Sequence, residues 1–180
     1  KRLKIFDPNT GAMVTRIKTR GPVQSGAVLC DSVIYFGVGP FQNELVAYGS
    51  PSAKTLWTRQ IKDVAGGPIL WKNRLIIGAS DRTLRAVDRD DGHDLWSIEL
   101  SGRPTAPPSL AGDLIVQPTD DGKVYGIQPD SGRVQFEVDL GHPLVSAAAC
   151  GELIWVTDIN GGVHALDPTD GRIVWQKSIG

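Results

Sequence analysis

Three histidines are the residues of this sequence best suited to bind a transition metal, because a neutral imidazole is a common zinc ligand. His93 falls in a predicted turn, His142 in a predicted connection between strands, and His164 at a predicted outward-facing strand position. The ligands of one zinc ion must converge, and these spacings do not bring the three together. We therefore expect no zinc site.

An acidic stretch, Asp88-Arg89-Asp90-Asp91-Gly92, resembles part of a calcium loop. An EF-hand loop needs oxygen ligands at its first, third and fifth positions and glycine at the sixth. Gly92 stands at the fifth position, and Asp and Gly are also typical of β-turns. We interpret the stretch as a hairpin turn and expect no metal-binding residues.

Motifs for nucleophilic or phosphoryl chemistry are missing from the sequence. It contains neither a Gly-x-Ser-x-Gly elbow nor a Gly-x-x-x-x-Gly-Lys-Ser/Thr loop. Nearly every aspartate falls in a predicted turn, so no carboxylate can be nominated for acid–base catalysis. The sequence predicts no catalytic residues and a protein that is not an enzyme.

The balance of charge argues against nucleic acid as a partner. Lys and Arg number 19 and Asp and Glu 20, and the basic residues are scattered rather than clustered. The longest apolar runs are strand-sized, well short of the ~20 residues that cross a bilayer. We expect a globular domain with no membrane span in this chain.

An internal repeat of about forty residues positions these side chains. Its anchors are Asp7, Gly49, Asp88, Gln128 and Asp167, at successive intervals of 42, 39, 40 and 39 residues. A small or aliphatic residue precedes each anchor by two places, and a Gly or Ala follows it by four. An aromatic residue follows the last four anchors by eight places: these are Trp57, Trp96, Phe136 and Trp175.

Each repeat unit is predicted to be β throughout. A short apolar run such as Leu153–Val156 precedes turn residues, an alternating strand, a second turn and the strand with the aromatic. A further short strand before the apolar run makes four strands per unit, and no segment keeps a helical period. We divide the single domain 1–180 into a partial blade, 1–24, and four blades, 25–65, 66–105, 106–145 and 146–180.

Four-stranded antiparallel units of this length are the blades of a β-propeller. We expect the recurring aromatics to join one blade to the next beside small residues that leave room for a ring. The predicted blade-docking residues are Trp57, Trp96, Phe136, Trp175, Ala86, Ala165, Gly92, Gly132 and Gly171. Cys30 and Cys150 hold equivalent positions three repeats apart, so we expect two free thiols.

The pattern Ala-x-Asp-x-x-x-Gly-x-x-x-Trp, intact from Ala86 to Trp96 and from Ala165 to Trp175, resembles the tryptophan-docking motif of PQQ-like propeller repeats. That family includes quinoprotein dehydrogenases, the BamB type of outer-membrane assembly protein and sensor ectodomains. Quinoprotein dehydrogenases have a vicinal Cys-Cys disulfide and a calcium site, and this chain has no Cys-Cys pair. The resemblance therefore implies no bound cofactor here.

Two units depart from the motif. Thr15 replaces the aromatic of the first unit, and Gly49 and Ala53 replace the Asp and Gly of the second. We expect those units to be docked less regularly. About four and a half blades are present, which predicts an arc of a seven- or eight-bladed ring whose remaining blades come from the same or another chain; a closed ring of four blades is the alternative.

The longest predicted hairpin loop, 37–44, is the candidate partner-binding site. The candidate contact residues are Pro40, Phe41, Gln42 and Asn43, with Arg82 and Asp120 from the corresponding hairpins of neighbouring blades. An alternative is a tolerated insertion whose Phe41 folds back onto its blade.

Two classes of function remain open from the sequence. The first is a non-catalytic scaffold or sensor that binds proteins through one propeller face, at the extracytoplasmic location that the resemblance implies. The second is part of a quinoprotein oxidoreductase, or a sensor ectodomain, whose ligand site lies outside this chain. Fold by itself does not choose between them.

Overall fold

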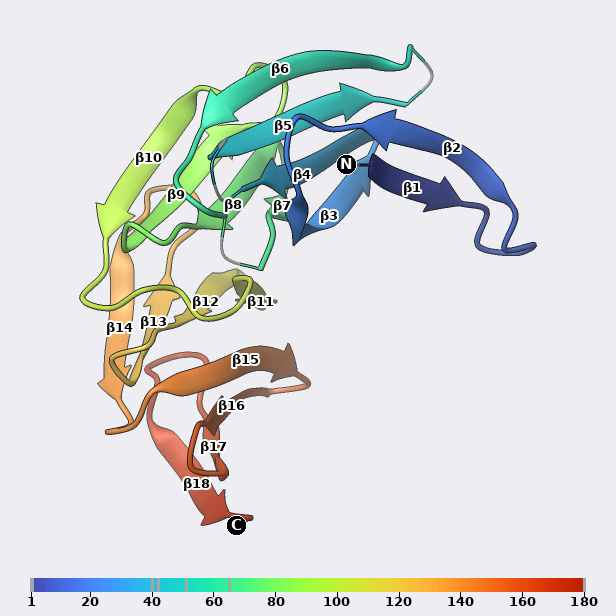
Figure 1. Cartoon of the computed structure of the whole chain (residues 1–180). Coiled ribbons are helices and arrows are strands. Elements are labelled where there is room, and N and C mark those ends of the chain that lie inside the picture. The colour runs from blue at the N-terminus through green and yellow to red at the C-terminus, as the bar shows by residue number, and fades with distance from the viewer. Residues whose placement is uncertain (1, 40, 42, 51, 65, 180) are drawn as a thin grey trace.

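The computed structural model describes residues 2–39, 41, 43–50, 52–64 and 66–179, and all the regular structure in these ranges is β (Figure 1). The first sheet pairs β1 (Arg2–Phe6) with β2 (Met13–Lys18). Four four-stranded antiparallel sheets follow, which we call blades 1 to 4. The all-β propeller architecture predicted from the repeat is confirmed.

Each blade is a meander in which strands adjacent in sequence are hydrogen-bonded neighbours. Blade 1 consists of β3 (Val23–Cys30), β4 (Val33–Val38), β5 (Glu44–Gly49) and β6 (Lys54–Gln60). Blade 2 consists of β7 (Ile69–Trp71), β8 (Arg74–Gly78), β9 (Thr83–Asp88) and β10 (Asp94–Glu99). Blade 3 consists of β11 (Ser109–Ala111), β12 (Leu114–Pro118), β13 (Lys123–Ile127) and β14 (Val134–Asp139). Blade 4 consists of β15 (Leu144–Cys150), β16 (Leu153–Asp158), β17 (Gly162–Leu166) and β18 (Ile173–Ser178).

The sheets fan around an arc, with the fourth strand of each blade on the outside (Figure 1). The β1–β2 sheet lies at one end and blade 4 at the other. Two inner strands begin earlier than the predicted blade boundaries: β3 begins at Val23 rather than 25, and β15 at Leu144 rather than 146. Both strands contain a register shift near their start, so they continue across an irregularity that the sequence pattern does not mark.

The hydrophobic core is divided into four clusters, one in each joint between successive sheets. In the second joint, Leu45 and Tyr35 of blade 1 pack with Leu75 and Val87 of blade 2. The other clusters join the β1–β2 sheet to blade 1, blade 2 to blade 3, and blade 3 to blade 4. Burial therefore occurs on both faces of a blade that has a neighbour on each side.

The repeated aromatic of one blade lies against the repeated glycine of the next. A Cβ added to Gly92 would lie 2.7 Å from the Trp57 ring, and one added to Gly132 would lie 2.8 Å from the Trp96 ring. Phe136 has the same relation to Gly171, at 2.5 Å. The glycine of each of these motifs therefore contacts the aromatic ring of the preceding repeat, not the ring of its own repeat.

Hydrogen bonds and small residues complete each joint. Trp57 Nε1 donates to the Arg89 carbonyl at 3.0 Å, and Trp96 Nε1 donates to the Pro129 carbonyl at 2.8 Å. Within its own blade each ring lies beside a small residue on the neighbouring strand, Ala86 for Trp96 and Gly126 for Phe136. The Trp96 indole therefore packs between Ala86 of its own blade and Gly132 of the next, and one hydrogen bond fixes its orientation.

The departures from the motif fall together in the first joint. In the other units, the aromatic eight residues after the anchor packs against the turn of the next unit. Thr15 holds this position in the first unit, and the turn of the next unit contains Gly49 and Ala53, so all three residues belong to one joint. A turn that receives no ring can carry a Cβ, and Ala53 keeps the left-handed backbone with a φ of 50°. Ile17 and Phe36 belong to the apolar cluster that fills this joint.

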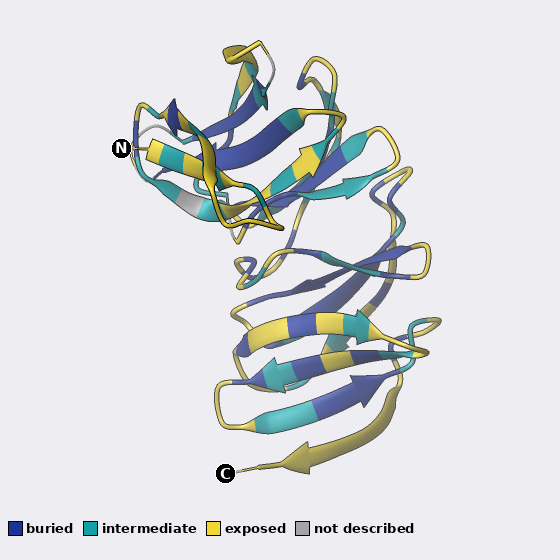
Figure 2. Ribbon diagram, turned by 90° about the vertical axis from the view of Figure 1, so that its right-hand side faces the viewer, coloured by how far each residue is buried: buried dark blue, intermediate teal, exposed yellow. Residues whose placement is uncertain are grey.

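Trp175 differs from the other three aromatics because no described sheet covers its face of blade 4. It is 40% exposed and packs edge-on against Trp155 of the same blade, with ring centroids 5.2 Å apart. β18 is exposed along its whole length (Figure 2). Within the described chain, Trp175 therefore joins no second blade.

Substitution of Trp96 separates the packing of the ring from its hydrogen bond. We expect Trp96→Ala to lower the free energy of unfolding by about 2–4 kcal/mol, since it empties the joint between blades 2 and 3. Trp96→Phe keeps most of the packing and should cost about 1 kcal/mol, the net value of one hydrogen bond. Urea unfolding followed by circular dichroism measures both. Equal losses for the two variants would contradict the seating of the ring.

Two glycines with the same turn geometry offer a matched comparison. Gly132 has a φ of 72° and Trp96 above it, whereas Gly11 has a φ of 68° and no atom within 4 Å of an added Cβ. Gly11→Ala should cost only the backbone strain, about 1 kcal/mol. Gly132→Ala should cost more, because the ring must also move. Unfolding of dilute protein tests this, and a Gly132→Ala variant as stable as Gly11→Ala would refute it.

Candidate protein-binding face

The hairpin loop between β4 and β5 comprises residues 39–43, one residue longer than its counterparts at 79–82 and 119–122. The sequence predicts a wider loop, 37–44. The observed loop is shorter because β4 continues through Val38 and β5 begins at Glu44, and these two residues pair with each other. This hairpin and its counterparts in the other blades form one face of the arc, which we call the hairpin face.

Hydrogen bonds fix both sides of the loop. Gly39 N donates to the Pro22 carbonyl at 3.1 Å, and the Asn43 carbonyl accepts from Ile61 N at 2.7 Å. Asn43 Oδ1 also accepts from Asp63 N at 3.2 Å. Asn43 therefore positions the loop, and its side chain is already engaged within the protein.

Phe41 projects from this anchored loop, with 87% of its surface exposed. The alternative in which Phe41 folds back onto its blade is therefore wrong. Pro40 and Gln42, the other two candidate residues of the loop, lie outside the described residues.

The candidate residues of the neighbouring hairpins behave differently from each other. Arg82 has a half-exposed side chain that pairs with Glu99 through Nη2 and Oε1 at 2.9 Å. Asp120 Oδ1 accepts from Arg103 N at 2.7 Å, so this carboxylate holds its hairpin against the connection between blades 2 and 3. Arg82 is the more available of the two for a contact.

Ile159 is an exposed residue on the hairpin face that the sequence reasoning missed. It is 67% exposed, and its N–H donates to the Pro143 carbonyl at 2.9 Å, as Asp120 N–H does to Arg103. The two residues therefore hold equivalent positions in blades 4 and 3. The available signal was an isoleucine in a turn otherwise made of Asp, Asn and Gly.

His164 is buried, which corrects the prediction that it faces outward. The alternation of β17 directs it toward blade 3, and Nε2 lies 2.9 Å from Asp158 Oδ2. This contact, with the N–H groups of Gly162 and Asn160, holds the pKa of Asp158 below its usual value. Among the described residues, His164 Nδ1 has no hydrogen-bond partner.

A depression of about 420 Å³ lies at this position. Its lining residues include His164, His142 and Lys177.

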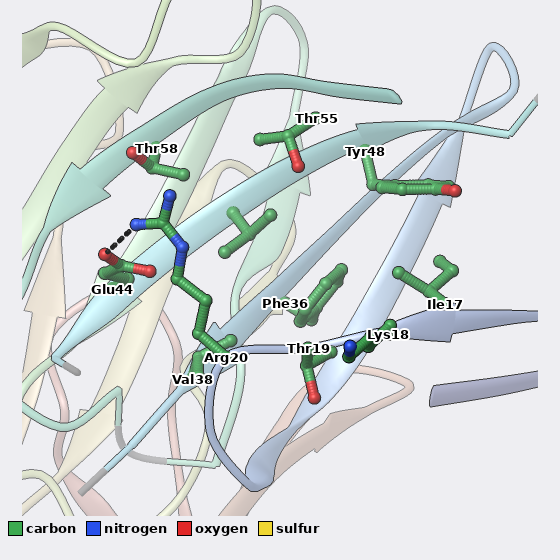
Figure 3. Close-up of a pocket in the computed structure, with 11 residues that line it drawn as sticks. Ile17, Lys18, Thr19, Arg20, Phe36, Val38, Glu44, Tyr48, Thr55 and Thr58 are labelled. Carbon is green, nitrogen blue, oxygen red and sulfur yellow. Dashed lines mark hydrogen bonds and ion pairs between the residues drawn. The ribbon is translucent and has the colours of Figure 1, made fainter. Parts of the chain in front are cut away.

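A small cavity of about 160 Å³ lies in the first joint, between β2 and blade 1 (Figure 3). Phe36, Val46 and Ile17 form its apolar wall, and Glu44 stands at one end, with Arg20 Nη1 3.4 Å from its Oε1. Ligand sites typically measure about 300–1,000 Å³. This cavity has room for a single side chain. It lies in the joint where Thr15 replaces the docked aromatic of the other joints.

A larger depression, about 950 Å³, lies on the face opposite the hairpin face. It is bounded by the turns that join first to second and third to fourth strands. Trp71 is at one side, and Lys72 Nζ lies 3.9 Å from the centre of its ring. The sequence predicts no partner-binding residue on this face, because its turn residues conform to the repeat.

A pyrroloquinoline quinone site, which the name of the repeat implies, does not fit the residues present. Cys30 on β3 and Cys150 on β15 are free and belong to different blades. No group of three or more His, Cys, Asp or Glu residues in the described ranges is placed to hold a metal ion. The described part of the chain contains no helix long and apolar enough to cross a membrane.

Comparison with known proteins adds a family to this geometry. The profile of the family described as outer membrane protein assembly factor BamB matches residues 1–149. BamB of Burkholderia pseudomallei is 31% identical over 133 residues, which is 71% of this chain and 33% of that protein. The chain spans about a fifth to a third of the curated relatives that it matches.

Solved structures agree on the fold. BamB from Moraxella catarrhalis superposes with a TM-score of 0.75 at 20% identity, over 90% of this chain and 50% of that one. Quinohemoprotein alcohol dehydrogenase from Comamonas testosteroni gives a TM-score of 0.72 at 15% identity, over 88% of this chain and 35% of that one. At these identities the superpositions establish the fold alone. The profile match over most of the sequence goes further, and this chain belongs to the BamB family of outer membrane protein assembly factors.

Proposed function

We propose that this chain is a non-catalytic propeller scaffold that binds a protein partner through the hairpin face and takes part in outer membrane protein assembly. The family to which it belongs is named for that process, and the proposal places the chain outside the cytoplasm. The observation that carries the binding site is Phe41, whose ring is 87% exposed on an anchored loop.

The energetics favour Phe41 as the central contact. Aromatic side chains supply large contact areas and are enriched among the residues that dominate binding energies. The two ends of the loop are held through Gly39 and Asn43, which limits the chain entropy lost when a partner covers the ring. Arg82 and Ile159 add a cation and an apolar group to the same face.

Rigid joints support this role. Trp57 and Trp96 fix blades 1 to 3 relative to one another through ring packing and a hydrogen bond each. Loops on rigid elements can present a constant surface to a partner. The Phe41 loop and the Arg82 hairpin, on adjacent blades, are therefore held in a fixed relation.

A photoreactive amino acid placed at position 41 of the full-length protein tests the proposal in the source cells. We expect irradiation to produce a discrete crosslink to a protein of the outer membrane assembly pathway, identified by mass spectrometry. The matched control is position 29 on β3, since Leu29 is also exposed, at 66%, but lies away from the loop. The same crosslinks at both positions, or none at 41, would refute the site.

Phe41→Ser provides the complementary measurement. Because the ring makes little contact within the protein, the free energy of unfolding should change by no more than about 0.5 kcal/mol. The cellular level of folded outer membrane proteins should nevertheless fall. If that level equals the wild type while the variant is normally folded, Phe41 is not the contact.

A further inference from the structure

The carboxylate at one end of the cavity in the first joint is paired weakly within the protein. Glu44 Oε1 lies 3.4 Å from Arg20 Nη1 (Figure 3) and 3.4 Å from Gln60 Nε2. Charge-assisted hydrogen bonds usually measure about 2.7–2.9 Å, so both contacts are long. The Glu44 side chain is 11% exposed, whereas that of Arg20 is 79% exposed. A mostly buried anion therefore has as its cation a side chain that stands mostly in solvent.

Both walls of the cavity are internal to the sequence. One wall is β2 with the connection that follows it, and the other consists of β4, β5 and β6 of blade 1. In the strand order that the blades share, a further strand of the first sheet would pair with β1, on the side away from β2. The space beside Glu44 is thus set by how β2 packs on blade 1.

The second joint fills the corresponding space with an arginine of its own. Arg85 lies three residues before the repeat anchor of blade 2, the position that Val46 holds in blade 1. Arg85 Nε donates to Thr83 Oγ1 at 3.0 Å, and Arg85 Nη2 lies 3.3 Å from Asp81 Oδ2. In the first joint Glu44 holds the position of Thr83, and the short Val46 side chain carries no cation to it. The first joint therefore keeps an anion and lacks the internal guanidinium.

We propose that this cavity is a pocket for an arginine side chain of the protein that binds the hairpin face, and that Glu44 pairs with the incoming guanidinium. The inference rests on the proposed function, which supplies the partner. Val38 and Glu44 pair across the base of the hairpin that carries Phe41, so the pocket and the exposed ring belong to one contact surface. Arg20 moves aside into solvent when the partner's arginine enters.

The lining of the pocket favours arginine over other side chains. A guanidinium presents several N–H donors in one plane, a geometry that matches a carboxylate such as that of Glu44. The methylene groups of the arginine stem can pack on Val46 and Ile17, and the face of the Phe36 ring attracts a cation. An acidic side chain would be repelled by Glu44, and an apolar one would bury this carboxylate without a better partner.

Methyl NMR of the full-length protein, labelled at its threonines, tests the pocket directly. The probe is N-acetyl-arginine N-methylamide, and the matched control is the citrulline analogue, which has nearly the same shape and no charge. We expect the arginine probe to shift the Thr55 and Thr58 methyl signals until they saturate, and to leave Thr169 on the opposite face unchanged. The citrulline probe should bind about tenfold more weakly or less, since it lacks the charge that pairs with Glu44. Equal binding of the two probes, or binding of neither, would overturn the proposal.

Two variants close the pocket in different ways. Glu44→Gln removes the charge, and Val46→Arg supplies an internal arginine at the position of Arg85. Each should weaken binding of the arginine probe about tenfold or more, whereas Arg20→Ala should strengthen it by removing a competing cation. Circular dichroism verifies that the variants fold, and Glu44→Gln decides the matter if Val46→Arg does not. A folded variant of either kind that binds the probe as the wild type does would contradict the pocket, as would weaker binding by Arg20→Ala.

The photocrosslink at position 41 separates this inference from the proposed function. We expect Glu44→Gln and Val46→Arg to lower the yield of that crosslink, because the partner loses its arginine contact. An undiminished yield in both folded variants would overturn the arginine pocket and leave Phe41 as the contact. A protein that binds the arginine probe but gives no crosslink at position 41 would refute the proposed function, while the pocket itself would stand.

Discussion

An aromatic ring that joins two β-sheets needs a surface on the second sheet where no Cβ stands in its way. In this protein that surface is a five-residue turn with glycine in the left-handed conformation, and Trp57, Trp96 and Phe136 each occupy one. The ring and the glycine recur together because Gly92, Gly132 and Gly171 each receive the ring of the unit before. Blade order, core division and the orientation of the hairpins all depend on these joints.

The first joint shows what happens when the constraint is relaxed. Without a ring at Thr15, the turn at Ala53 no longer needs glycine, and ordinary apolar packing around Phe36 and Ile17 joins the sheets. This packing leaves a cavity of about 160 Å³ lined in part by Ile17 and Thr55. In the second joint the equivalent positions are held by Arg59 and Asp94, which form an ion pair. The hairpin with Phe41 belongs to the blade beside this joint.

The proposed binding function rests on the ends of the strands. Backbone hydrogen bonds from the hairpins to the connections between blades repeat around the arc, through Gly39, Asp120 and Ile159 among others. These hydrogen bonds engage backbone polar groups that a partner could otherwise bind. Side chains such as Phe41 remain exposed to solvent. A rigid scaffold with a few projecting groups is suited to binding, which agrees with membership of a family of assembly factors.

The sequence by itself determined the strands, the repeat and the propeller class, because alternation and turn residues are local signals. It also identified the aromatics and glycines of the joints and predicted that the aromatics join successive blades. It did not show which turn receives each ring, since the spacing within one unit does not contain that information. Only the tertiary structure placed His164 inside a joint, showed that Asn43 and Asp120 are engaged internally, and exposed Phe41 and Ile159. Whether a side chain is buried depends on the neighbouring blade, and that contact is set by packing between sheets rather than by the pattern within one.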